Sequence, residues 1–329
     1  MNFENIDCID SGTEFCPCKL AEQNECILCS QLRGRHFCDC INWKGTCIYQ
    51  EFYNNGSKAK EGRKTIDCTI NSIEQKEKNL IALSAIVPHK LAIDLSAPGS
   101  YVFLRTDDNI YMDFPISVAY SDTDSNMLSL FIEVRGVKTK KLLDLTSGDT
   151  IGIRGPYWNG VFGLKNINTC KDSNCIIIAR GIGQAPMIPV IKKLISNNNS
   201  IRLIIDKSPF SDIYINEYLK TLNMTYEELS VIDKGELTDS IKQLITEEKK
   251  AKGISLIHSA GADILTYKII EFIDTVDKDI KLSCCNNAKM CCGEGMCGSC
   301  TARFKGHKVK RLCKIQTDPR SIFEGRRFI

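Results

Sequence analysis

The chain has 329 residues, of which 43% are hydrophobic and 25% charged, and its formal net charge is +3. This length predicts two or three domains, and the near-neutral charge gives no indication of nucleic-acid binding. No apolar run reaches the roughly 18 residues of a membrane-spanning helix, and the N-terminus lacks a signal-peptide pattern. We therefore expect a cytoplasmic protein without membrane insertion.

Cysteine is the unusual residue of this sequence. The chain contains 18 cysteines, eight of them between Cys8 and Cys47 and seven between Cys284 and Cys313. In a long chain without a secretion signal, clustered cysteines more often bind metal than form disulfides. Both ends of the chain are therefore expected to bind metal, and the middle is expected to have another function.

Residues 1–60 are predicted to form an irregular, cysteine-rich metal-binding module. So short a segment with few large apolar side chains cannot offset its chain entropy without a further constraint, which metal–thiolate bonds can supply. Eight thiols allow two four-ligand sites. The spacing fits neither a pair of zinc knuckles nor a ferredoxin run, so iron–sulfur and zinc both remain open. The candidate ligands are Cys8, Cys16, Cys18, Cys26, Cys29, Cys38, Cys40 and Cys47.

Residues 61–165 are predicted to form an antiparallel β-sandwich or barrel. Short runs such as NLIALSAIV and MLSLFIEV alternate with turn segments such as SDTDSN and SGD. Closely spaced β-rich runs with polar turns between them are typical of such domains.

Residues 166–283 are predicted to form a doubly wound α/β domain that binds a nucleotide. The run CIIIA resembles a buried parallel strand and is followed by a glycine-rich turn containing Gly181 and Gly183, with Pro186 at the start of the next helix. Such a turn presents backbone N–H groups to a pyrophosphate. Asp206 ends the second strand, where an acid can bind a ribose hydroxyl and repel a 2′-phosphate. This favours NADH over NADPH.

Residues 284–329 are predicted to form a 2Fe–2S cluster domain. The spacing is Cys292-x4-Cys297-x2-Cys300-x12-Cys313. It matches the three-cysteine run with a distant fourth ligand of plant-type 2Fe–2S proteins, and differs from the paired C-x2-C knuckles of most zinc sites.

The order of a β-barrel, an α/β domain and a C-terminal plant-type cluster resembles the electron-transfer subunit of bacterial dihydroorotate dehydrogenase, within the ferredoxin–NADP reductase superfamily. Subunits of NADH-dependent ferredoxin:NADP oxidoreductase and of sulfide dehydrogenase are similar. The resemblance covers roughly residues 65–320. It implies an α+β multidomain chain with FAD on the barrel and NAD(H) on the α/β domain.

The resemblance also implies the flavin-binding residues. The family's Arg-Pro-x-Ser motif reads Phe114-Pro115-Ile116-Ser117, so a phenylalanine replaces the arginine that meets the flavin phosphate. The family's Gly-x-Gly-Thr motif reads Gly136-Val137-Lys138-Thr139, and Lys138 or Arg135 is expected to supply the missing positive charge. The Gly-Pro-x-x-Asn-Gly motif is intact, with Gly155, Asn159 and Gly160. The Cys-Gly-Pro motif of many relatives is replaced by Ser259-Ala260-Gly261.

Together these features indicate a subunit that transfers electrons between NAD(H), FAD and a 2Fe–2S cluster, with the substrate chemistry on a catalytic or electron-accepting partner subunit. Flavin does the hydride chemistry, so no catalytic side chain is expected from this chain. One alternative is a subunit of an electron-bifurcating or ferredoxin-linked complex, extended by N-terminal clusters. Another is a zinc-scaffolded adaptor with a degenerate nucleotide site.

Overall fold

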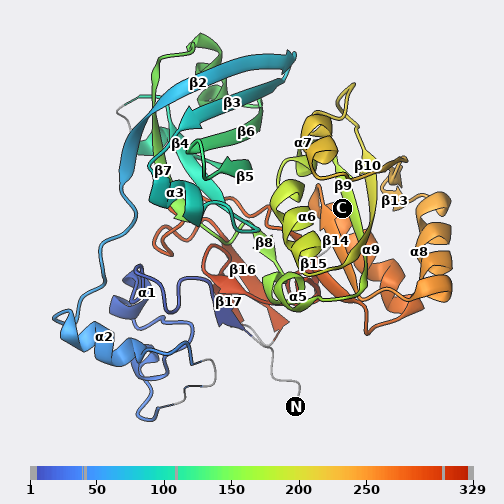
Figure 1. Cartoon of the computed structure of the whole chain (residues 1–329). Coiled ribbons are helices and arrows are strands. Elements are labelled where there is room, and N and C mark those ends of the chain that lie inside the picture. Colours follow the sequence, from blue (N-terminus) through green and yellow to red (C-terminus); the bar gives the residue numbers. More distant parts are fainter. Residues whose placement is uncertain (1–5, 39, 41–42, 108–109, 306–307, 325–329) are drawn as a thin grey trace. The chain divides into compact units, whose positions relative to one another are not determined.

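The computed structural model describes residues 6–38, 40, 43–107, 110–305 and 308–324. These fall into two compact units (Figure 1). One comprises residues 66–287. The other combines residues up to 65 with residues 288–325, so the N-terminal cysteine-rich segment and the C-terminal cysteine loop pack together.

The first part of the larger unit is a closed barrel of six strands in the order β2-β3-β6-β5-β4-β7. The prediction of a barrel is confirmed. Leu83, Leu104 and Leu130 are among the fully buried side chains of its core. The strands are β2 (Thr65–Glu77), β3 (Leu80–Ile86), β4 (Tyr101–Arg105), β5 (Phe114–Asp122), β6 (Met127–Glu133) and β7 (Thr150–Tyr157). The helices between them are α3 (His89–Asp94), η2 (Ile110–Met112), α4 (Val137–Lys140) and η3 (Lys141–Asp144).

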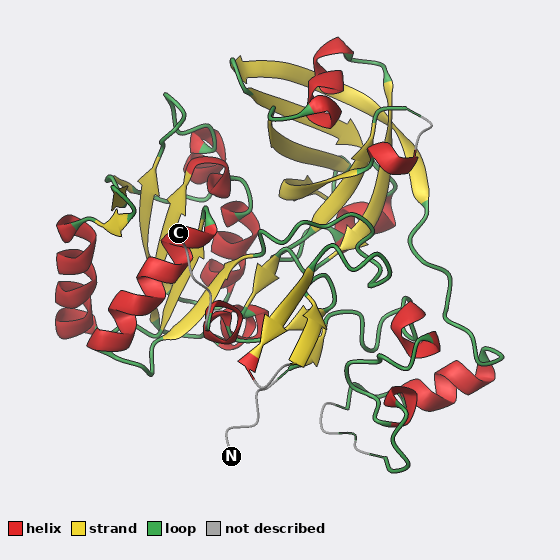
Figure 2. Ribbon diagram, turned by 180° about the vertical axis from the view of Figure 1, so that it is seen from behind, coloured by secondary structure: helices red, strands yellow, loops and turns green. Residues whose placement is uncertain are grey.

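The second part is a six-stranded sheet in the order β11-β10-β9-β14-β15-β8, parallel except for β8, which confirms the α/β prediction. Figures 1 and 2 show α6 and α9 on opposite faces of this sheet. The strands are β8 (Val161–Phe162), β9 (Asn174–Arg180), β10 (Ser200–Asp206), β11 (Glu227–Glu228), β14 (Leu256–Ala260) and β15 (Lys281–Cys285). The remaining elements are α5 (Leu164–Thr169), η4 (Gly181–Gln184), α6 (Met187–Ser196), α7 (Asn216–Thr221), β12 (Ile232–Asp233), β13 (Glu236–Leu237), α8 (Asp239–Lys252) and α9 (Asp263–Val276).

The barrel and the sheet share one hydrophobic cluster. Phe131 of the barrel lies against Tyr214 of the α/β part, with ring centroids 4.6 Å apart, and Tyr120 lies 5.4 Å from Tyr218. Strand β9 is buried on both sides because helices cover both faces of the sheet, which explains its continuous apolar run.

The smaller unit has little regular structure. Strand β1 (Asp7–Cys8) pairs antiparallel with β18 (Ile315–Gln316), which joins the two ends of the chain. Strands β16 (Thr301–Phe304) and β17 (Lys308–Arg311) form a hairpin. The helices are α1 (Lys19–Glu22), η1 (Gln31–Arg33), α2 (Ile48–Asn54) and α10 (Pro319–Phe323).

A buried network of charges lies inside this smaller unit. Asp10 accepts from Arg63 Nη2 at 2.8 Å and from Lys314 Nζ at 2.5 Å. Glu294 pairs with the same two cations at 3.3 and 3.1 Å. The side chains of Arg63 and Lys314 are at most 1% exposed. Two cations and two anions balance, which is the condition under which charges are tolerated away from water.

Among the described residues, no helix combines the length and the apolar character that crossing a bilayer requires.

Candidate functional site

The four C-terminal cysteines lie in two pairs. Cys292 lies near Cys297, and Cys300 lies near Cys313, since the two thiols of each pair shift each other's pKa. A 2Fe–2S cluster shares four thiolates between two irons, so two pairs of thiols match its ligand set.

The loop between these cysteines curls so that backbone amides face the sulfurs. The N–H groups of Glu294 and Cys297 donate to Cys292 Sγ at 3.3 and 3.4 Å, and that of Cys313 donates to Cys300 Sγ at 3.4 Å. Such N–H groups stabilise thiolates. The curl needs the left-handed backbone that glycine adopts readily, found at Gly293, Gly295 and Gly298.

One thiol of each pair has a lowered pKa. Burial alone would raise the pKa of Cys297, but hydrogen bonds from Ser299 and Cys292 outweigh it and lower the pKa to about 7. The neighbouring Cys313 lowers the pKa of Cys300 to about 6. Burial raises the pKa of Cys292, and the neighbouring Cys300 raises the pKa of Cys313. Each pair thus holds one thiolate near neutral pH, the form that binds metal.

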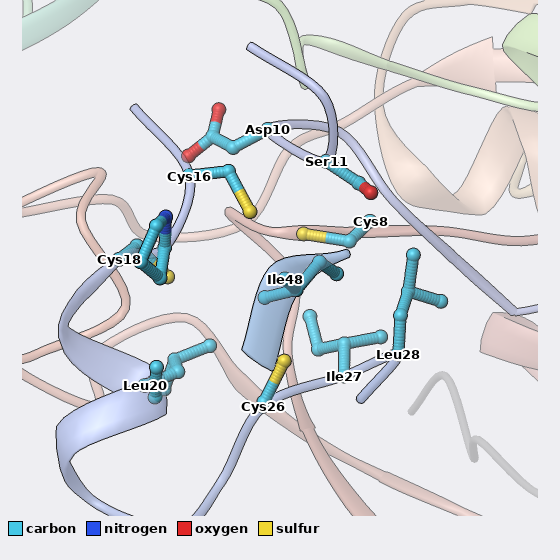
Figure 3. A pocket seen from close by; sticks show the side chains of 12 residues that line it. Cys8, Asp10, Ser11, Cys16, Cys18, Leu20, Cys26, Ile27, Leu28 and Ile48 are labelled. Carbon is cyan, nitrogen blue, oxygen red and sulfur yellow. The ribbon is translucent and has the colours of Figure 1, made fainter. Parts of the chain in front are cut away.

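Four of the eight N-terminal cysteines line one pocket (Figure 3): Cys8, Cys16, Cys18 and Cys26. In Figure 3 the sulfurs of Cys8, Cys16 and Cys26 point into the space between them. Burial raises the pKa of Cys16 to about 12 and also raises the pKa values of Cys8 and Cys18. Without a metal, the thiols of Cys8, Cys16 and Cys18 are therefore neutral.

The other four N-terminal cysteines, Cys29, Cys38, Cys40 and Cys47, do not line this pocket. The sulfurs of Cys38 and Cys40 are 3.4 Å apart, and both residues are exposed. Cys47 caps α2, since its sulfur accepts from Gln50 N at 3.5 Å. Within the described part of the chain, no three His, Cys, Asp or Glu side chains are close enough together to hold a single metal ion.

The predicted flavin motif lies at the start of β5. Phe114 is buried, Pro115 is exposed, and Ile116 and Ser117 are half-buried. Ser117 pairs with Tyr101 of β4, and its hydroxyl makes no hydrogen bond to any described residue. The hydroxyl therefore remains available to a ligand on the barrel.

Lys138 lies beside the position where Phe114 replaces the family's arginine. Its Nζ donates to the carbonyl oxygens of Tyr111 and Asp113 at 2.6 and 2.8 Å, directly before Phe114 in the chain. Arg135 instead pairs with Glu133 at 2.8 Å and is exposed. Of the two predicted substitutes, Lys138 is the one whose charge stands near the motif.

Two further arginines add positive charge near the motif. Arg105 and Arg154 both pair with Asp113, at 2.6 and 3.0 Å, so one carboxylate faces two guanidinium groups. Together with Lys138, these side chains gather three positive charges near the motif. Such a group of charges suits a pyrophosphate.

The turn from Gly136 to Thr139 is held by the Thr139 hydroxyl, which accepts from the backbone N–H groups of Arg135 and Gly136 at 3.0 and 3.2 Å. A β-carbon at Gly136 would meet no atom within 4 Å, so the turn has open space beside it. The barrel residues therefore fit FAD: they offer the hydroxyl of Ser117, an open turn and a group of positive charges.

The third predicted flavin motif has a packing role in this structure. A β-carbon at Gly160 would lie 2.7 Å from the Gly99 oxygen, and one at Gly155 would lie 3.1 Å from Val102. Asn159 is 1% exposed, and its carbonyl accepts from Asn286 Nδ2 at 2.7 Å. These residues shape the junction between the barrel and the sheet.

The glycine-rich turn lies where β9 ends, between this strand and α6. Gly181 has a φ of +56°, and a β-carbon at Gly183 would lie 2.4 Å from the Ala260 oxygen at the end of β14. Only glycine allows this close approach. Pro186 immediately precedes α6.

Gln184, within the turn, is fully buried, and neither atom of its amide group has a hydrogen-bond partner among the described residues. Buried side-chain amides without hydrogen-bond partners are rare, so the amide of Gln184 is a candidate contact for a bound ligand. The turn therefore fits a nucleotide.

Tyr214 covers this turn, and sequence patterns gave no signal for it. Its hydroxyl donates to the Gly181 oxygen at 3.0 Å, and the backbone N–H groups of Gln184 and Ala185 lie near enough to lower the pKa of the hydroxyl. Burial outweighs them and raises the pKa of the hydroxyl, so it stays neutral. A nucleotide phosphate that approaches the N–H groups of the turn would therefore meet this hydroxyl.

Asp206, at the end of β10, is 4% exposed and engaged within the protein. It pairs with Arg180 at 3.1 Å and accepts from the backbone N–H groups of Ser208 and Val231 at 3.0 and 3.1 Å. Its predicted role in nucleotide choice stays a prediction.

A closed barrel followed by a parallel sheet with a glycine-rich turn is the fold of the ferredoxin–NADP reductase superfamily. Comparison with solved structures agrees. A chain of an NADH-dependent reduced ferredoxin–NADP oxidoreductase, reported for flavin-based electron bifurcation, matches with a TM-score of 0.59 and 16% identity, covering 80% of this chain and 95% of that one. No family model matches the sequence.

The curated relatives narrow this class. The dihydroorotate dehydrogenase B (NAD(+)) electron transfer subunit of Clostridium acetobutylicum is 31% identical over 218 residues, which cover 66% of this chain and 81% of the relative. The corresponding subunit of Caldanaerobacter subterraneus is 24% identical over 66% of this chain and 82% of its own. The chain belongs to the family of dihydroorotate dehydrogenase B electron transfer subunits, which are oxidoreductase components. The resemblance found in the sequence is confirmed.

Proposed function

We propose that this chain is the NADH-oxidising, electron-transferring subunit of a cytoplasmic oxidoreductase whose substrate chemistry lies on a catalytic partner subunit. FAD would lie on the barrel at Ser117 and the Gly136–Thr139 turn, and NAD(H) at Gly181, Gly183 and Pro186. Cys292, Cys297, Cys300 and Cys313 would ligate a 2Fe–2S cluster. The relatives are named for dihydroorotate oxidation, so dihydroorotate is the first substrate to test on the partner.

The observation that supports this proposal best is the pairing of the four C-terminal thiols. They belong to a chain of an electron-transfer family, and backbone N–H groups face two of the four sulfurs. When bound, flavin accepts a hydride and releases single electrons, and an iron–sulfur cluster carries single electrons. The protein has only to bind and orient these groups.

On the barrel, the chain's own contribution is electrostatic. Lys138, Arg105 and Arg154 lie near the flavin motif, and their positive charges would attract a pyrophosphate. The half-buried Ser117 hydroxyl can both donate and accept a hydrogen bond. It therefore suits a ring nitrogen that changes its protonation on reduction.

The N-terminal module gives a second candidate function, a subunit of an electron-bifurcating or ferredoxin-linked complex. The specific observation is that four of its cysteines line one pocket within the same unit as the C-terminal loop. We propose that residues 1–60 bind metal through at least four of their eight cysteines. If this metal is zinc, and the nucleotide site does not function, the chain is an adaptor instead.

The test is the Cys297→Ser variant of the full chain, purified anaerobically beside Cys291→Ser. Cys291 is exposed and immediately precedes the ligand Cys292, so it is a matched control. Cys297→Ser is expected to lose the visible and paramagnetic-resonance spectrum of the 2Fe–2S cluster and to keep bound flavin that NADH bleaches. Cys291→Ser is expected to keep both. An unchanged cluster spectrum in Cys297→Ser would refute the ligand assignment, and flavin-free protein would refute the barrel assignment.

A further inference from the structure

The structure divides the eight N-terminal cysteines into two sets of four, a division that their spacing does not reveal. Cys8 comes from β1, Cys16 and Cys18 from the segment before α1, and Cys26 from the segment after it. Figure 3 shows these four around one pocket. The other four lie outside the lining.

The cysteine thiols are the main potential metal ligands of the pocket. Most of its other lining side chains are apolar. Its one carboxylate, Asp10, is already paired with Arg63 and Lys314. Thiolates in an apolar surround select zinc, copper(I) or iron–sulfur clusters over hard cations. The apolar lining residues are Pro17, Leu20, Ala21, Ile27, Leu28 and Ile48.

Whether ligand side chains converge on one point distinguishes a site for a single ion from a site for a cluster. A zinc–sulfur distance of about 2.3 Å puts the four sulfurs of a tetrahedral site about 3.8 Å apart. Sulfurs that close occur elsewhere in the chain, at 3.4 Å between Cys38 and Cys40. Around the pocket no thiol hydrogen-bonds another, and no three ligand side chains of the described chain converge on one ion. A four-iron cluster needs no such convergence, because each thiolate binds a different iron.

The pocket shares a wall with the C-terminal cysteine loop. Cys8 is paired with Ile315, two residues after the ligand Cys313, and Ile9 N donates to the Lys314 oxygen at 2.9 Å. Leu20 lines the pocket and packs so closely on Gly295 of the loop that a β-carbon there would lie 3.0 Å from it. A cluster in the pocket and a cluster in the C-terminal loop would be separated only by the β1–β18 pair and by Leu20.

We propose that Cys8, Cys16, Cys18 and Cys26 ligate a 4Fe–4S cluster that exchanges electrons with the 2Fe–2S cluster across this wall. The inference rests on the proposed function for its redox partner. In the exchange one electron leaves the reduced 2Fe–2S cluster, which is oxidised, and enters the 4Fe–4S cluster, which is reduced. No bond to the protein forms or breaks. The N-terminal module thus adds a second cluster that can exchange electrons with a partner protein.

The experiment uses the full chain, expressed with ⁵⁷Fe and purified anaerobically, as wild type, Cys16→Ala and Cys40→Ala. Cys40 is the matched control because it also belongs to a C-x-C pair but lies outside the pocket. Mössbauer spectra of the wild type are expected to show a 4Fe–4S component beside the 2Fe–2S component. Cys16→Ala is expected to lose that component or convert it to a three-iron cluster, and Cys40→Ala to retain it.

Paramagnetic resonance of the fully reduced protein tests the shared wall. The 2Fe–2S signal is expected to be broadened by its neighbour in the wild type and to sharpen in Cys16→Ala. Zinc in place of the 4Fe–4S component in the wild type would overturn the inference even if Cys16→Ala did not fold. Loss of the component in Cys40→Ala and its retention in Cys16→Ala would also overturn it. In either case an intact 2Fe–2S signal and NADH-driven flavin bleaching would leave the proposed function standing.

Discussion

Asp10→Asn is the substitution whose effect follows most directly from the structure. The carboxylate of Asp10 lies between Arg63 and Lys314, whose side chains are 0% and 1% exposed. With Glu294, the network holds two cations and two anions. The asparagine keeps the shape but removes one anion, so a buried positive charge is left uncompensated.

Removing one partner of a buried ion pair costs roughly 3–5 kcal/mol. Because about 1.4 kcal/mol changes an equilibrium tenfold, the smaller unit should open roughly 100- to 4,000-fold more often. The reporter is the Ile9 amide, which donates to the Lys314 oxygen at 2.9 Å. Hydrogen exchange of the peptide containing this amide, measured in the full chain by mass spectrometry, should accelerate by that factor.

The matched control is Asp7→Asn. Asp7 pairs with Lys44 at 2.5 Å, but both side chains are more than one-third exposed. Such a surface pair is worth at most about 1 kcal/mol, so exchange should accelerate less than about tenfold. Equal exchange in the two variants would refute the network's role.

The pH dependence has a definite sign. Burial alone would raise the pKa of Asp10, but Lys314 and Arg63 outweigh it and hold the pKa below 3.8. A carboxyl whose pKa is depressed on folding contributes its stability above the unfolded pKa and loses it as the pH falls through the folded value. The difference between wild type and Asp10→Asn should therefore be complete at neutral pH and shrink only below about pH 4.

Three further outcomes are expected. Lys138→Ala should raise the Kd for FAD roughly 10- to 100-fold in a fluorescence titration of the flavin-free chain, since a charged hydrogen-bond donor is lost, whereas Arg135→Ala should change it little; equal effects would refute the assignment to Lys138. Tyr214→Phe should lower the Kd for NADH by up to about tenfold, because the hydroxyl no longer stands beside the N–H groups of the turn. An unchanged Kd would show that the Tyr214 hydroxyl does not hinder nucleotide binding. NADH should reduce the flavin faster than NADPH in stopped-flow experiments, by a small margin because Arg180 partly neutralises Asp206, and faster reduction by NADPH would refute the role of Asp206.

The sequence predicted the parts of the fold that depend on local patterns. Alternating apolar residues with polar turns identified the barrel strands, and the continuous run of β9 identified the buried parallel sheet. The spacing of Cys292, Cys297 and Cys300 was sufficient to suggest a cluster type, because the ligands lie in one short loop.

The rest depends on contacts between distant segments, which local patterns do not encode. Tyr214 reaches the turn at Gly181 from 33 residues away in the sequence. Asp10 meets Lys314 across 304 residues, and the only hint was that Lys314 follows a predicted ligand. The engagement of Asp206 by Arg180 required the pairing of β9 with β10.

The central claim is that this chain moves electrons from NADH through flavin to a 2Fe–2S cluster, and one measurement tests it directly. The anaerobically purified full chain is titrated with NADH while its visible spectrum is recorded, and samples are frozen for paramagnetic resonance. The account predicts that flavin absorbance bleaches and that a reduced 2Fe–2S signal appears, in the wild type but not in Cys297→Ser. Flavin that NADH does not bleach, or a chain without flavin or a 2Fe–2S signal under any reductant, would contradict it.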